Sequence, residues 1–201
     1  MKKITIFMLL LCVGFTVNAQ KKFSFGFKGG LNIASIGGDN SDGTSPRIGL
    51  HLGVMGELSL SDKFSIQPEL VYSQQGVKQD VAFTNQGMTI ATAELEARYN
   101  YLNLPILAKY YITENFSVEA GPQIGFLVSA EQEGGGVSVD ADEVVNNIDF
   151  SAGVGLGYKL NNGLNFNARY NIGLSDINDV AGTTDKNFNG VLQLSIGYFL
   201  R

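Results

Sequence analysis

The sequence predicts an all-β fold, an eight-stranded antiparallel up-and-down transmembrane β-barrel, on three observations. Glycine is abundant and charge is low, with 25 Gly and 16% charged residues in 201. Apolar and small or polar residues alternate along most of the chain, as they do in strands with two unlike faces. Short polar turns and long connections also alternate. The mean hydropathy of +0.07 is too low for a polytopic helical membrane protein.

The N-terminus predicts a secretory signal peptide. A short basic start, Met1–Lys3, precedes an apolar run, Ile4–Val17, and Ala19 follows at the expected cleavage position. The apolar run is shorter than the roughly 20 residues that a spanning helix needs. We therefore expect a cleaved leader over residues 1–19 and a barrel domain over residues 20–201.

Cysteine content and net charge narrow the classes of protein further. Cys12 is the only cysteine and lies within the expected leader. A lipid-attachment site at Cys12 is the alternative, but the bulky Leu11 precedes it where such sites carry a small residue. The net charge of −5 argues against nucleic acid as a partner, because phosphate binding needs a basic surface.

Eight segments carry the alternation. In the clearest of them, Leu156 and Tyr158 lie on one face, and Gly155 and Gly157 lie on the other. The expected strands are 23–33, 48–60, 64–73, 101–112, 116–128, 148–160, 164–172 and 192–200.

The connections predict a barrel with two unlike ends. Three are tight polar turns, at 61–63, 113–115 and 161–163. Four are long, at 35–46, 77–98, 131–147 and 174–186. With eight strands, all long connections fall at one end, and both termini fall at the other. Residues 85–87 suit the tip of a hairpin in which 81–84 pair with 88–92.

The small polar face is expected inside and the bulky apolar face on lipid. An eight-stranded barrel has an interior just wide enough for side chains, which suits Gly, Ser and Asn. A transmembrane barrel presents its apolar face to lipid. The alternative, a soluble β-sandwich with one wet face, does not explain the alternation of short and long connections.

Several stretches resemble a known family. Phe27–Asn32, Gln67–Gly76, Tyr101–Tyr110 and Ala120–Gly125 together resemble the PorT-like outer membrane β-barrel family of Gram-negative bacteria. The resemblance implies an integral outer-membrane barrel. The family's namesake is tied to protein secretion, a role that the resemblance alone does not carry over. The C-terminal residues 197–201 resemble outer-membrane targeting strands, so we expect the barrel-assembly machinery to act on them.

Six charged residues share the inward face, near the short-turn end. We expect them to form one belt of ion pairs, because unpaired buried charge is costly. A structural plug that holds the strand register is favoured over a selectivity or gating cluster. The six residues are Lys28, Glu57, Glu69, Lys109, Glu119 and Arg169.

The sole histidine, His51, is expected to point into the lumen. An enzyme that used His51 with Asp149 and Ser151 at the outer rim is an alternative. No local motif supports that alternative, so we expect neither catalysis nor a cofactor.

The long connections hold most of the 19 acidic residues. The densest group surrounds three consecutive glycines, and calcium binding by its oxygens is conceivable. Because it lacks EF-hand spacing, a solvated, like-charged loop is favoured and no metal site is expected. The group comprises Glu131, Glu133, Asp140, Asp142 and Glu143.

These patterns favour a structural, interaction or secretion-associated barrel without catalytic activity that acts through acidic surface loops. A small-solute or ion pore is the main alternative. The expected partners are outer-membrane lipid, the barrel-assembly machinery, and a protein or surface ligand at the long loops.

Overall fold

The computed structural model describes residues 23–200, apart from positions 40, 42, 86, 87 and 181. The predicted leader and Cys12 lie outside the described residues. The elements are β1 (Phe23–Gly38), β2 (Thr44–Ser59), β3 (Phe64–Asn85), β4 (Met88–Tyr111), β5 (Phe116–Gly134), β6 (Val137–Asp140), the 3-10 helix η1 (Asp142–Val144), β7 (Ile148–Lys159), β8 (Leu164–Gly173) and β9 (Asn187–Phe199).

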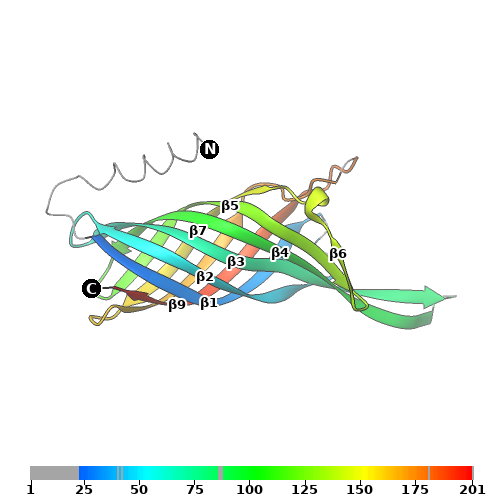
Figure 1. The fold of residues 1–201 in the computed structure, drawn as a ribbon, viewed down its shortest axis with the longest axis horizontal. Helices are drawn as coiled ribbons and strands as arrows, with labels where there is room; N and C mark the ends of the chain where they lie inside the picture. Colours follow the sequence, from blue (N-terminus) through cyan, green and yellow to red (C-terminus); the bar gives the residue numbers. More distant parts are fainter. Residues whose placement is uncertain (1–22, 40, 42, 86–87, 181, 201) are drawn as a thin grey trace.

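Eight of these strands close into a ring. Their order is β4-β3-β2-β1-β9-β8-β7-β5, and β4 also pairs with β5, so the sheet has no open edge around the barrel. All pairings are antiparallel, and the first and last strands meet with Gly26 opposite Phe199. Figure 1 shows the strands tilted along one elongated barrel. The predicted eight-stranded antiparallel barrel is confirmed.

The long connections contain more strand than the sequence predicted. β3 and β4 remain paired to Asn85 and Met88, which confirms the expected hairpin, and Figure 1 shows this hairpin projecting past the barrel. The next long connection adds β6, a short strand that pairs with β5 alone. Because β6 ends the strand order, it lies outside the closed ring.

The two faces have the polarity of a membrane barrel. Outward side chains are apolar and exposed, such as Leu52 at 69% and Leu194 at 44%. Inward side chains are polar and buried, such as Asn32 at 0% and Arg169 at 1%. A β-sandwich with a wet face would show the reverse. In the part of the chain that is described, no helix is long and apolar enough to cross a membrane.

Some glycines are required by close approach of neighbouring strands. A Cβ atom on Gly30 would lie 1.9 Å from the carbonyl oxygen of Leu194, and one on Gly121 would lie 2.0 Å from that of Ile106. No side chain fits at those distances. Part of the glycine excess therefore reflects strand packing in a narrow barrel.

Candidate functional site

The centre of the lumen is crossed by an ion pair between β3 and β8. Arg169 Nη1 and Nη2 donate to the two carboxylate oxygens of Glu69, at 3.0 and 2.8 Å. Lys28 Nζ, on β1, lies 3.1 Å from Glu69 Oε2. In the ring order β3 and β8 are four places apart, so the Glu69–Arg169 pair spans the barrel's diameter.

Glu119, on β5, adds a second carboxylate to this network. Arg169 Nε donates to Glu119 Oε1 at 2.8 Å, and Lys109 Nζ lies 3.9 Å from Glu119 Oε2. Gln67 closes the circuit, because it accepts from Lys109 Nζ at 3.1 Å and donates to Glu69 Oε1 at 2.7 Å. We call Lys28, Gln67, Glu69, Lys109, Glu119 and Arg169 the lumen belt.

Glu57, the sixth predicted member, lies nearer the short-turn end. Its carboxylate forms an ion pair of 2.8 Å with Lys159 Nζ and accepts hydrogen bonds from Tyr111 and Ser65. The expectation of a single belt is therefore corrected: ion pairs and hydrogen bonds join five of the six charges, and Glu57 pairs with Lys159 nearer the rim. Lys109 links the two groups, because its Nζ lies 5.8 Å from the Tyr111 ring centroid. Lys159 and Gln67 were missed, although both share the inward face of their strands: Lys159 lies at the end of its strand, and Gln67 carries no charge.

His51 lies in a polar layer further out. Its Nδ1 is 2.8 Å from Asn32 Oδ1, and its Nε2 is 2.8 Å from Ser195 Oγ. Neither of these partners is Asp149 or Ser151. The alternative His–Asp–Ser arrangement is thus not assembled in the described structure.

The two other members of that alternative have partners of their own. Asp149 accepts from Ser175 Oγ at 2.9 Å and from Asn189 Nδ2 at 3.1 Å. Ser151 accepts from Gln123 Nε2 at 2.9 Å. These bonds satisfy buried polar groups, as a folded interior requires.

The outer end of the barrel contains an apolar cluster. Tyr101 of β4 is fully buried there, beside two residues of the long connections, Val145 and Ile177. Val145 bridges to Asn178, and Asn146 Nδ2 donates to the carbonyl oxygens of Asp176 and Asn178. Two long connections are therefore fastened together over this end. The cluster comprises Tyr99, Tyr101, Ala130, Ala141, Val145 and Ile177.

The base of the projecting hairpin carries paired surface charges. Glu96 Oε1 lies 2.7 Å from Arg47 Nε and 2.8 Å from Arg98 Nε. These contacts, with Arg98 foremost, lower the pKa of Glu96, which lies on the part of β4 beyond the bilayer, to about 2. Lys78 Nζ lies 2.8 Å from Glu94 Oε1, and Arg98 pairs with Glu133. Part of the loop acidity is therefore neutralised locally.

The five acidic residues of the 131–147 connection do not converge on one point. Asp142 accepts from the backbone N–H of Ala130, Asp140 accepts from that of Asp142, and Glu131 accepts from Ser138. Within the described ranges, no three His, Cys, Asp or Glu residues are grouped closely enough to hold a metal ion. The conceived calcium site has no support in this geometry.

A comparison with known proteins identifies the family to which this barrel belongs. A family model described as "outer membrane protein beta-barrel domain" matches residues 18–179. The chain belongs to this family. It is thereby an outer-membrane β-barrel protein of the Gram-negative type. No curated protein sequence matches the chain.

Solved barrels share this fold at low sequence identity. Ail, the attachment invasion locus protein of Yersinia pestis, is 14% identical with a TM-score of 0.52, over 89% of this chain and 99% of Ail. Neisserial surface protein A is 12% identical with a TM-score of 0.53, over 88% of this chain and 98% of that chain. At such identities the likeness concerns the fold alone. In transmembrane barrels of this type the short turns face the periplasm and the longer loops face outward.

Proposed function

We propose that this outer-membrane barrel is a closed scaffold that presents its outer loops to a partner, rather than a pore. The lumen belt is the observation that carries the proposal. Its Glu69–Arg169 pair crosses the diameter with both side chains about 1% exposed or less. A solute would have to separate a bidentate ion pair in a space that eight strands already make narrow.

The outer end supports the same conclusion. The apolar cluster around Tyr101 lies above the belt, so a solute would meet a second obstruction there. Beyond it, the β3–β4 hairpin projects from the barrel, as Figure 1 shows, with its base braced by ion pairs. A projecting hairpin among acidic loops suits recognition of a protein or surface ligand that carries positive charge.

Two further parts of this proposal concern how the chain reaches the outer membrane and what its resemblance to the PorT-like family suggests. We infer that the leader 1–19 directs the chain across the inner membrane and that the barrel-assembly machinery inserts the domain 20–201. The interaction role that we propose includes association with secretion, which the PorT-like resemblance by itself does not assign. The absence of an assembled His51 site favours a non-catalytic role.

Planar-bilayer recording tests the closed lumen. The purified barrel should give no steady, large unitary currents. A variant that breaks the belt, Arg169→Ala, should show transient leakage if it folds, because the obstruction at the diameter is then removed. Steady unitary currents from the unaltered protein would instead establish the pore alternative.

Site-specific crosslinking tests the loop role. A crosslinker attached at Ser138→Cys, on exposed β6, should capture an outer-membrane or surface component in intact cells. The same crosslinker at Ser61→Cys, in a periplasmic turn, is the matched control. Capture that is equal at both positions, or absent at Ser138, would contradict recognition through the outer loops.

A further inference from the structure

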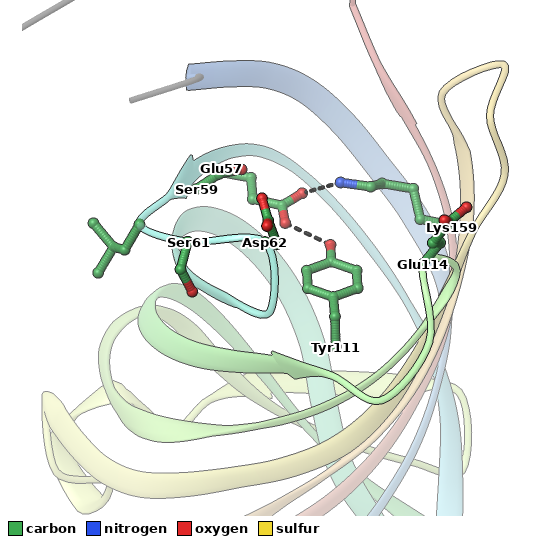
Figure 2. A pocket seen from close by; sticks show the side chains of 8 residues that line it. Glu57, Ser59, Ser61, Asp62, Tyr111, Glu114 and Lys159 are labelled. Carbon is green, nitrogen blue, oxygen red and sulfur yellow. Dashed lines mark hydrogen bonds and ion pairs between the residues drawn. The ribbon is translucent and has the colours of Figure 1, made fainter. Parts of the chain in front are cut away.

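A pocket opens at the short-turn end of the barrel, remote from the outer loops. It has a volume of about 340 Å³ and is shown in Figure 2. A neighbouring cavity of about 500 Å³ shares Glu114 and Lys159 with it. Lys159 therefore stands between two openings of the periplasmic mouth. The first pocket is lined by Glu57, Ser59, Leu60, Ser61, Asp62, Tyr111, Glu114 and Lys159.

The ammonium of Lys159 is held in a cage of one carboxylate and two aromatic rings. Its Nζ is 2.8 Å from Glu57 Oε2, and it lies 5.1 Å from the ring centroid of Tyr111 and 5.3 Å from that of Phe199. Figure 2 shows Lys159 and Tyr111 both reaching Glu57. Carboxylate and ring faces at these distances are the groups that recognise an alkylammonium.

The two charged side chains of this cage differ in how firmly they are held. The Glu57 side chain is 1% exposed and is held by Tyr111 and Ser65, whereas the Lys159 side chain is 30% exposed. Lys159 is the last residue of β7, and its flexible four-carbon stem can leave toward solvent. If it left, Glu57 would lose its ion pair but keep the hydrogen bonds from Tyr111 and Ser65, with Lys109 Nζ 5.8 Å from the Tyr111 ring centroid. A second cation in the place of Lys159 would restore the ion pair of this buried carboxylate.

The pocket's charge favours such a replacement. Asp62 and Glu114 line it together with Glu57, against the single cation Lys159. An incoming ammonium would thus approach an acidic mouth and end between the same carboxylate and rings that now hold Lys159.

We propose that the periplasmic mouth is a binding site for a primary alkylammonium, which exchanges with the side chain of Lys159. The source of the ammonium is either a small diamine or a lysine side chain of a periplasmic protein. In both cases Glu57 binds the charge, Tyr111 and Phe199 face it, and Lys159 acts as a built-in competitor.

Titration of the purified full-length barrel with cadaverine, followed by calorimetry, tests the site. Lys159→Met should strengthen binding several-fold, because it removes the competitor and keeps the aliphatic stem. Lys63→Met is the matched control, since it removes the same charge from the same rim outside the cage. Equal strengthening by both variants would reduce the effect to net charge and overturn the proposal.

Two further variants test the cage itself in the Lys159→Met background. Glu57→Gln should abolish cadaverine binding, and Phe199→Leu, which alters no charge, should weaken it about two- to five-fold, the loss expected for one ring. The ring variant keeps the test decisive if Glu57→Gln fails to fold. Unchanged affinity in the ring variant, or cadaverine binding too weak to detect in Lys159→Met, would overturn the proposal.

A peptide with one lysine separates the two sources of ammonium. Tighter binding of the peptide than of cadaverine, abolished by acetylation of its lysine, would assign the site to a protein lysine. Binding of cadaverine alone would assign it to a small amine. Peptide binding that survives acetylation would overturn recognition of the ammonium.

Discussion

Glu69 is the residue on which the lumen belt converges. Its carboxylate accepts hydrogen bonds from Arg169, Lys28 and Gln67, which lie on three different strands. Burial of these charges is tolerable only because each has a partner. The belt therefore depends on every member being present.

Removal of Glu69 should strongly destabilise the barrel. Glu69→Ala leaves Arg169 and Lys28 with excess buried positive charge, so we expect the free energy of unfolding to fall by about 3–5 kcal/mol. Denaturant unfolding in lipid vesicles measures it. Glu143→Ala, on an exposed loop, is the control and should change stability little. Unchanged unfolding together with increased ion leakage would instead favour a gating role for Glu69.

Gly30→Ala should also destabilise the barrel, for a steric reason. Its new Cβ would clash with the carbonyl oxygen of Leu194 and force β1 and β9 apart. Gly37→Ala, on the same strand, meets nothing within 4 Å and should fold normally. Heat-modifiability on gels compares the two variants, and equal behaviour would refute this explanation of the glycine content.

Sequence alternation could place these residues on the inward face but could not pair them. The parity of each strand put Glu69 and Arg169 inside, whereas their contact depends on ring closure between strands 100 residues apart. Gln67 escaped notice because it carries no charge, and Lys159 because it lies at the end of its strand. Glu57 was grouped with the belt because depth along a tilted strand is not readable from spacing alone.

Among the elements, the β3–β4 hairpin shows how far turn chemistry can be read. Its pairing, including Val81 opposite Ala93, follows from the polar turn residues near position 86. β6 was not expected, because its glycine-rich surroundings look like an irregular loop. The ion pairs at the hairpin base join residues from β2, β4 and β5, so they too required the fold.

The base of this hairpin should loosen in acid. The pKa of Glu96 is lowered from 4.5 to about 2, so its carboxylate favours the native hairpin above about pH 4.5. That contribution is lost as the pH falls from there toward 2. Backbone order parameters of residues 92–98 at pH 6 and pH 2.5 measure the change.

The control for this pH effect removes the titrating group. In the Glu96→Gln variant, the order parameters of residues 92–98 should already be lower at pH 6 and should change less between the two pH values. Full retention of hairpin order at pH 2.5 in the unaltered protein would contradict a role for Glu96 in bracing it.

For the whole molecule, lipid must cover the apolar outer face. This face was fully predictable, because alternation and barrel width together leave one arrangement. The exposed leucines of β2 illustrate it, with Leu50 at 58% and Leu52 at 69%.

A charge placed on this face should lower the stability of the barrel more, the deeper it lies in the bilayer. Leu52→Arg, near the middle of β2, should lower the free energy of unfolding by about 2–4 kcal/mol, and Leu60→Arg, beside a short turn, by about 0–1 kcal/mol. Unfolding from lipid vesicles measures both. Equal costs at the two positions would contradict the membrane placement.

Ring closure also dictates an order of assembly. Glu69 belongs to β3 and Arg169 to β8, and β9 must still pair with β1 before the wall is complete. Until then the buried charges would face lipid without their partners, an unfavourable state for an open sheet in a bilayer. Insertion of this chain should therefore be all-or-none. The buried charges pair across the lumen in the same step in which β9 pairs with β1 and closes the barrel.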